Sequence, residues 1–163
     1  MTFFVRATLL WIAVAFVGDI MIGPLIAIRG IGPDFSIIAL VILALATGPV
    51  PGTAGGFLVG LVQDLAHPNL LGLRALCKCL LGFGLGRLRG RLVYGVPLVE
   101  GAVVAISVVA HDFLFLLVES KLTDEGFLSP FFTQTLPVAL YTGLIGIPLL
   151  RLADLLGILR RED

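Results

Sequence analysis

Residues 96–118 read VPLVEGAVVAISVVAHDFLFLLV, an apolar run that contains Glu100 and the pair His111–Asp112. A helix needs about 20 apolar residues to cross a bilayer, so this stretch is long enough to span one. The whole chain has the same character, since 58% of its 163 residues are apolar, 13% are charged and the mean hydropathy is +1.10. A soluble domain carries roughly 25% charged residues. We therefore expect an all-α, polytopic membrane protein.

Apolar runs along the chain predict a single integral membrane domain of six transmembrane helices, with the second and third short. The expected spans cover residues 7–28, 35–47, 52–66, 70–87, 96–118 and 135–156. Prolines in the segment Gly48–Gly52 separate the two short helices, because proline interrupts an ordinary helix interior. This pair forms either two tilted spans or a re-entrant hairpin. Six spans leave roughly 40 residues for loops and tails, too few for a soluble catalytic domain.

The charges are few but unevenly placed. Eleven Lys and Arg balance eleven Asp and Glu, so no overall basic field points to nucleic acid. In the six-span map most arginines fall on one side, namely Arg6, Arg87, Arg89, Arg91, Arg160 and Arg161. Arg29 and Lys121 fall on the other side. Because cytoplasmic loops are enriched in Lys and Arg, we expect both termini in the cytoplasm.

Two glycine series recur at a spacing of four residues. Gly52, Gly56 and Gly60 form the first, and Gly82 and Gly86 form the second. Residues four apart share one helix face, and small side chains there let helices approach closely within lipid. These faces either pack against each other within the chain or form a seam with a second copy or another partner.

Ionisable side chains inside apolar spans are costly, about 2.5–3.5 kcal/mol each at a helix centre. Arg74 and Lys78 lie four residues apart on one expected helix face, and Asp19 and Asp64 end or interrupt other apolar segments. We expect an intramembrane ion-pair cluster of these four residues that ties the first, third and fourth segments together. The alternatives are a substrate or ion pathway and contacts with a partner.

Catalytic and metal-binding motifs are missing from the sequence. His111 and Asp112 are adjacent, so on a helix they point about 100° apart and are not expected to form a hydrogen-bonded dyad alone. His67 and His111 have no metal-ligand spacing, and Cys77 and Cys79 point to nearly opposite helix faces. No phosphate-binding loop, dinucleotide fingerprint or nucleophile elbow occurs. We expect no enzyme, no cofactor and no metal.

Residues 32–91 resemble the rod shape-determining membrane protein family, MreD. The features that carry the resemblance are Pro33–Asp34 before a short apolar segment, the Gly-rich turn Gly48–Gly52, the glycine-spaced helix with Gly56 and Gly60, Asp64 at its end, and Leu71–Gly72 before the next helix. The resemblance implies a fold similar to the substrate-binding subunits of energy-coupling-factor vitamin transporters, in a bacterial inner membrane. Arg74 and Lys78 make this segment more cationic than the family pattern, so the resemblance assigns no role to these two residues.

The resemblance also implies partners and a function. The expected partner is the bitopic periplasmic scaffold MreC, with the MreB filament and peptidoglycan synthases nearby. The expected function is non-catalytic scaffolding and regulation of lateral wall synthesis. The alternative is a solute-binding subunit of an energy-coupling-factor transporter, which commonly carries an Ala-x-x-x-Ala face on its first helix. Here Ala7 is followed four residues later by Trp11, and Ala13 by Val17, so that docking face is missing.

Overall fold

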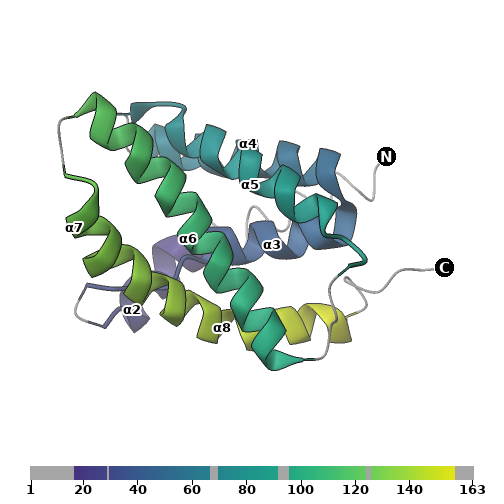
Figure 1. Ribbon diagram of the computed structural model, residues 1–163. Coiled ribbons are helices and arrows are strands. Elements are labelled where there is room, and N and C mark those ends of the chain that lie inside the picture. Colours follow the sequence, from purple (N-terminus) through teal and green to yellow (C-terminus); the bar gives the residue numbers. More distant parts are fainter. Residues whose placement is uncertain (1–16, 29, 67–69, 92–95, 124–125, 157–163) are drawn as a thin grey trace.

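A computed structural model describes residues 17–28, 30–66, 70–91, 96–123 and 126–156 (Figure 1). Within these ranges every extended regular element is helical, which confirms the all-α prediction. The elements are η1 (Gly18–Ile22), α2 (Gly23–Ile26), α3 (Phe35–Thr47), α4 (Pro49–Ala66), α5 (Leu73–Arg87), α6 (Pro97–Leu122), α7 (Leu128–Pro130), η3 (Phe131–Thr135) and α8 (Leu136–Leu155).

Helix α3 is the centre of the molecule. Every side chain from Phe35 to Leu45 is buried, which is the expected result for a helix that is apolar all round. The Asp34 carboxylate accepts a hydrogen bond from the backbone N–H of Ile37 at 2.9 Å and so caps the first turn. Gly48 ends the helix with a φ of +94°, a left-handed conformation that glycine adopts without strain.

The other long helices cover α3 from two sides. Helices α4 and α5 lie side by side as one antiparallel pair, and α6 and α8 form a second pair (Figure 1). Val104 and Val108 from α6 and Ala139 and Leu150 from α8 pack into the same core as α3. This three-part arrangement places the first turn of α3 deep among the other helices, where its polar groups need partners from the protein.

The segment before α3 folds back on itself. Ile28 and Ile31 exchange backbone hydrogen bonds of 2.9 and 3.0 Å, which closes a tight turn after α2. The Tyr141 hydroxyl of α8 donates a hydrogen bond of 2.7 Å to the Ile26 carbonyl and fixes this end of α2. The remainder of the expected first span, residues 7–16, lies outside the described residues.

Several helix boundaries differ from the expected segments. Helix α4 begins at Pro49 instead of residue 52. The N–H groups in the first turn of a helix have no acceptor within the helix, so Pro49 and Pro51, which lack this group, are tolerated there. Helix α6 continues through the polar sequence after Val118 and ends at Leu122. At the other side of the following loop, residues Leu128–Leu155 form one continuous helical stretch.

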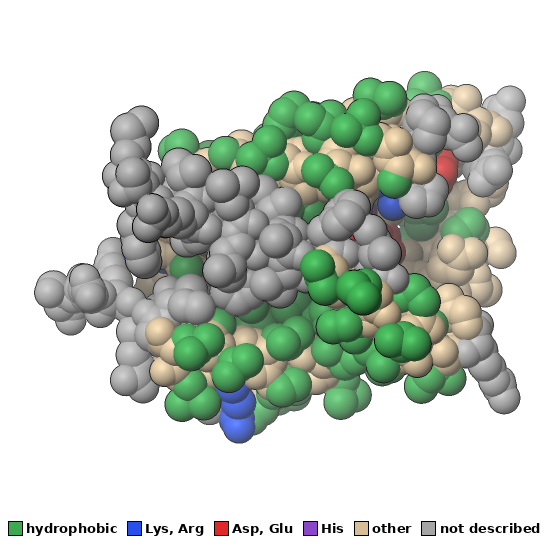
Figure 2. Space-filling model, turned by 180° about the vertical axis from the view of Figure 1, so that it is seen from behind, with side chains coloured by type: hydrophobic (Ala, Val, Ile, Leu, Met, Phe, Trp, Pro, Cys, Tyr) green, Lys and Arg blue, Asp and Glu red, His purple; other side chains and the backbone are tan. Residues whose placement is uncertain are grey.

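Among the described residues, two stretches are long and apolar enough to cross a membrane, Pro97–Leu122 and Leu128–Leu155. Helix α3 is a shorter apolar helix, about 20 Å long at 1.5 Å per residue. The outward faces carry large exposed apolar side chains, among them Leu98 at 80% and Leu140 and Leu144 at 71%. In Figure 2, apolar side chains make up much of the described surface of one face, which carries few charged groups. These surfaces suit a lipid environment.

Candidate functional site: a polar cluster at the start of the central helix

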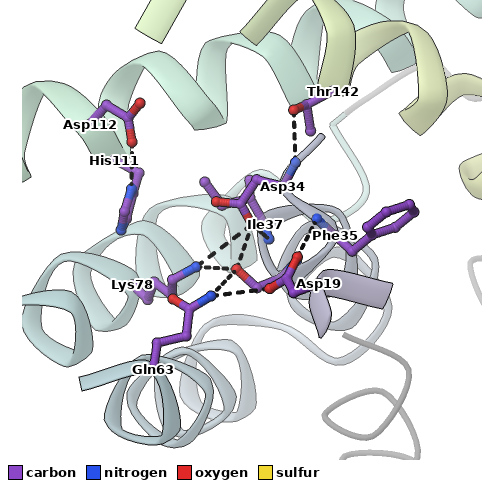
Figure 3. A network of polar contacts seen from close by, with 10 residues as sticks. Asp19, Asp34, Phe35, Ile37, Gln63, Lys78, His111, Asp112 and Thr142 are labelled. Carbon is purple, nitrogen blue, oxygen red and sulfur yellow. Dashed lines mark hydrogen bonds and ion pairs between the residues drawn. The ribbon is translucent and has the colours of Figure 1, made fainter. Parts of the chain in front are cut away.

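Two carboxylates meet at the first turn of α3 (Figure 3). Asp34 is the N-cap residue of α3 itself, and Asp19 belongs to η1, which precedes α3 in the chain. The Asp19 carboxylate accepts hydrogen bonds from the N–H groups of Phe35 at 2.9 Å and Ser36 at 3.3 Å. The start of a helix has unpaired N–H groups and a partial positive charge, so both carboxylates are stabilised there.

Lys78 of α5 supplies the positive charge of this cluster. Its side chain is completely buried, and its ammonium nitrogen lies 3.9 Å from the Asp34 carboxylate. The same ammonium group donates a hydrogen bond to the Ser36 hydroxyl. Gln63 of α4 completes the contact with amide hydrogen bonds of 3.1 Å to Asp19 and 3.0 Å to Ser36. Side chains from four segments therefore converge on one turn of α3.

The α6–α8 pair reaches the cluster through different groups. The backbone N–H of Asp34 donates to the Thr142 hydroxyl of α8 at 3.0 Å. His111 of α6 is drawn beside the cluster in Figure 3 and is buried, with 4% of its surface exposed. Its Nδ1 lies 3.0 Å from the Asp112 carboxylate. The expectation that these neighbours do not form a dyad is wrong, because side-chain rotation closes the angle between adjacent helical positions.

The four ion-pair candidates separate into two groups. Asp19 and Lys78 belong to the cluster at the start of α3, joined through Gln63 and Ser36. Asp64 instead accepts backbone hydrogen bonds of 3.0 to 3.2 Å from Gly72, Arg74 and Ala75. The Arg74 guanidinium carbon lies 4.9 Å from the centre of the Phe115 ring. Asp64 is therefore a cap for the N-terminus of α5, contributed by the end of α4.

Replacing Asp64 by alanine is expected to loosen the junction of α4 and α5. Asp64 is 1% exposed, so the three backbone N–H groups that donate hydrogen bonds to its carboxylate would lose their acceptor. Loss of a helix cap costs about 0.5–2 kcal/mol. Thermal unfolding of the purified protein should show a lower midpoint for Asp64→Ala, and a smaller decrease for Asp64→Asn, which keeps one acceptor. Equal midpoints for all three proteins would contradict this assignment.

The glycine series lie between α4 and α5 of the same chain. A Cβ built on Gly52 would lie 2.6 Å from the carbonyl oxygen of Gly82, and one on Gly60 would lie 2.6 Å from the backbone nitrogen of Ala75. Gly56 faces the Lys78 carbonyl, and Gly86 faces Pro49. These distances are too short for any side chain. The glycines bring the two backbones into contact and hold Lys78 at its depth in the bundle.

The residues that carry the family resemblance have clear structural places. Pro33 is buried immediately before Asp34, which caps α3. Asp64 caps α5, and Gly72 precedes α5 with a φ of +95°, in the left-handed region. The motif positions thus set the beginnings of two helices. Ser36, Gln63 and Thr142 cannot be recognised from the sequence, because isolated hydroxyls and amides in apolar segments show no spacing pattern.

The cluster is suited to holding helices together. Its hydrogen bonds join η1, α3, α4, α5 and α8, and most of its polar groups are already paired with one another. Among the described residues, no group of three or more His, Cys, Asp and Glu side chains has a metal-binding arrangement. A paired interior network of this kind fixes the relative positions of helices.

Comparison with known proteins gives one result. A family model for the rod shape-determining protein MreD matches residues 1–156. No curated protein and no solved structure gives a significant match. The match covers nearly all of the 163 residues, including both carboxylate caps and both glycine series. The chain therefore belongs to the MreD family of rod shape-determining proteins.

Proposed function

We propose that this chain is a non-catalytic membrane scaffold that supports rod shape by binding an MreC-type bitopic protein and promoting lateral peptidoglycan synthesis. The observation that carries the proposal is the family match over residues 1–156. The polar cluster is consistent with it, because its side chains are used to join helices. MreB filaments and peptidoglycan synthases are the further partners of this proposal.

The described surface is consistent with a protein that acts through contacts. The small residues of α4 and α5 face each other, so these two glycine series are already used within the chain. Apolar side chains on the outward faces of α6 and α8 remain exposed, including Ile106 at 66% and Leu144 at 71%. Such faces can contact lipid or the single membrane helix of a bitopic partner.

The function is tested by cell shape. In a rod-shaped bacterium depleted of its own MreD protein, expression of this chain should restore rods of normal width. Inactivating the bundle by Gly82→Leu should leave the cells round, whereas the exposed control Gly84→Leu should restore rods. Round cells with the wild-type chain, present in the membrane at the level of the depleted protein, would contradict the proposal.

The proposed topology places both termini in the cytoplasm of the inner membrane. The turn between α3 and α4 lies at the same end of the bundle as the last turn of α5, because Gly86 contacts Pro49 and Arg89 lies against Gly48. That end carries Arg87, Arg89 and Arg91, so the positive-inside tendency assigns it to the cytoplasm. This position of the turn supports two short spans rather than a hairpin that turns within the bilayer.

Cysteine labelling tests the topology. Val50 is 78% exposed at the start of α4, so Val50→Cys places an accessible thiol at this turn. Combined with replacement of Cys77 and Cys79 by serine, it should react with a membrane-impermeant maleimide only in inverted vesicles. Labelling from the periplasmic side, or protection from both sides while a detergent-treated sample reacts, would contradict the two-span arrangement.

A further inference from the structure

One face of α5 is lined by apolar side chains and ends in an arginine. Leu76, Leu80 and Phe83 are 54%, 53% and 43% exposed, and Arg87 follows as the last residue of the helix. Their spacing of four, three and four residues places all of them on one side of the helix. This face is not used by the α4–α5 seam, whose contacts on α5 come from Ala75, Lys78, Gly82 and Gly86.

The length of this face matches one leaflet of a bilayer. Leu76 and Arg87 are eleven positions apart, which is about 16 Å along a helix. Half of the roughly 30 Å hydrocarbon core is about 15 Å. The three apolar side chains therefore cover the depth of a lipid tail, and Arg87 lies where the headgroup of the same lipid begins.

Three exposed arginines lie at and just beyond the C-terminal end of α5. Arg87, Arg89 and Arg91 are all exposed, and the stretch from residue 80 to residue 91 has no acidic residue. The Arg87 guanidinium carbon lies 5.1 Å from the centre of the Phe83 ring, so its side chain stays above the apolar face. In the described part of the chain, the close ion pairs are formed by Lys78, His111 and Arg151 and do not include this group of arginines.

We propose that this face of α5 binds one anionic glycerophospholipid of the adjacent leaflet. Arg87 and Arg91 hold the phosphate, and Leu76, Leu80 and Phe83 contact the acyl chains. The planar guanidinium group donates paired hydrogen bonds to phosphate oxygens, which favours this headgroup chemistry. Arg89 has a different main contact, because its side chain lies against Gly48 at the end of α3.

Native mass spectrometry of the full-length chain tests the lipid site. The wild-type protein in mild detergent is equilibrated with equal amounts of phosphatidylglycerol and phosphatidylcholine that have identical tails. We expect it to retain phosphatidylglycerol preferentially. The double variant Arg87→Gln/Arg91→Gln leaves Arg89 in place. Its preference for phosphatidylglycerol should be about thirtyfold smaller than that of the wild type, which corresponds to the attraction of two arginines to an anionic lipid surface.

Two control variants separate this site from general charge attraction. Lys121→Gln removes an exposed cation from the last turn of α6, at the end of the bundle opposite to Arg87, and should leave the lipid preference unchanged. Arg87→Lys/Arg91→Lys keeps both charges and should retain only part of it. Equal retention of both lipids by the wild type would overturn the proposal. An unchanged preference in the glutamine variant would do the same.

Free phosphate distinguishes a lipid site from a site for phosphate alone. Adding inorganic phosphate at millimolar concentration should not displace the bound phosphatidylglycerol, because the tail contacts are missing from the competitor. Displacement by phosphate, or an equal increase of the unfolding midpoint with phosphate and with phosphatidylglycerol, would overturn the assignment to a lipid. Replacing Leu80 by glutamine should weaken lipid retention without changing the fold, since this side chain is 53% exposed.

Discussion

Replacing Gly82 by leucine is expected to prevent stable folding of the bundle. A Cβ at Gly82 would lie 2.6 Å from the carbonyl carbon of Gly52, and still closer to its oxygen. No rotation of a side chain relieves a contact with backbone, so α4 and α5 must separate. Overpacking in a well-packed core costs about 1–3 kcal/mol and occasionally more. Separation of α4 from α5 also displaces Lys78 and Gln63, which adds to that cost.

The matched control is Gly84→Leu on the same helix. A Cβ at Gly84 meets no atom within 4 Å, so the added side chain should extend outward without disturbing the packing. Size-exclusion chromatography in detergent and thermal unfolding measure both variants. We expect a monodisperse, folded Gly84→Leu protein and an aggregated or strongly destabilised Gly82→Leu protein. Equal behaviour of the two would show that close approach of α4 and α5 is not required.

Replacing Lys78 by methionine is expected to destabilise the protein by about 3–5 kcal/mol. The substitution removes the buried cation that lies 3.9 Å from Asp34 and donates to Ser36. Asp34 and Asp19 then remain as two carboxylates near one helix start without their positive partner. The control Lys121→Met removes an exposed lysine and should change the free energy of unfolding by less than about 0.5 kcal/mol.

A double variant tests whether charge compensation is the cause. Asp34→Asn combined with Lys78→Met removes one negative and one positive charge, and the introduced asparagine keeps an acceptor for the Ile37 N–H. The double variant should be more stable than the sum of the single effects predicts, with a coupling of about 0.5–3 kcal/mol. Additive effects in reversible unfolding measurements would mean that charge pairing with Asp34 is not the cause of the stabilisation by Lys78.

Much of the fold follows from local signals in the sequence. Helix α3 lies between Asp34, a side chain that caps helices, and Gly48, whose positive φ ends them. Those two residues mark boundaries that tertiary contacts do not change. The start of α4 was harder to predict, because Pro49 and Pro51 interrupt a helix interior but are tolerated in a first turn. Helix α6 extends past Val118 through the polar sequence Glu119 to Leu122. The apolar run marks only the part of the helix that ends at Val118, so this extension was not predicted.

The polar cluster depends on contacts that the sequence does not encode locally. Asp19 and Lys78 were identifiable as charged residues in apolar segments, but Asp64 looked equivalent to them and is a backbone cap. Ser36, Gln63 and Thr142 are recognised only once η1, α3, α4 and α8 are placed together. The spacing of Gly52, Gly56 and Gly60 predicted close packing, whereas the choice of α5 as the neighbour needed the structure.

Co-purification from native membranes in mild detergent tests the proposed scaffold function most directly. The experiment uses the full chain with a C-terminal tag, and the Gly82→Leu variant serves as a control for contacts that depend on the folded bundle. We expect the wild type, and not this variant, to recover an MreC-type bitopic protein together with peptidoglycan synthases. Recovery of the ATPase subunits of an energy-coupling-factor transporter without wall-synthesis proteins would contradict the proposal and support the solute-binding alternative.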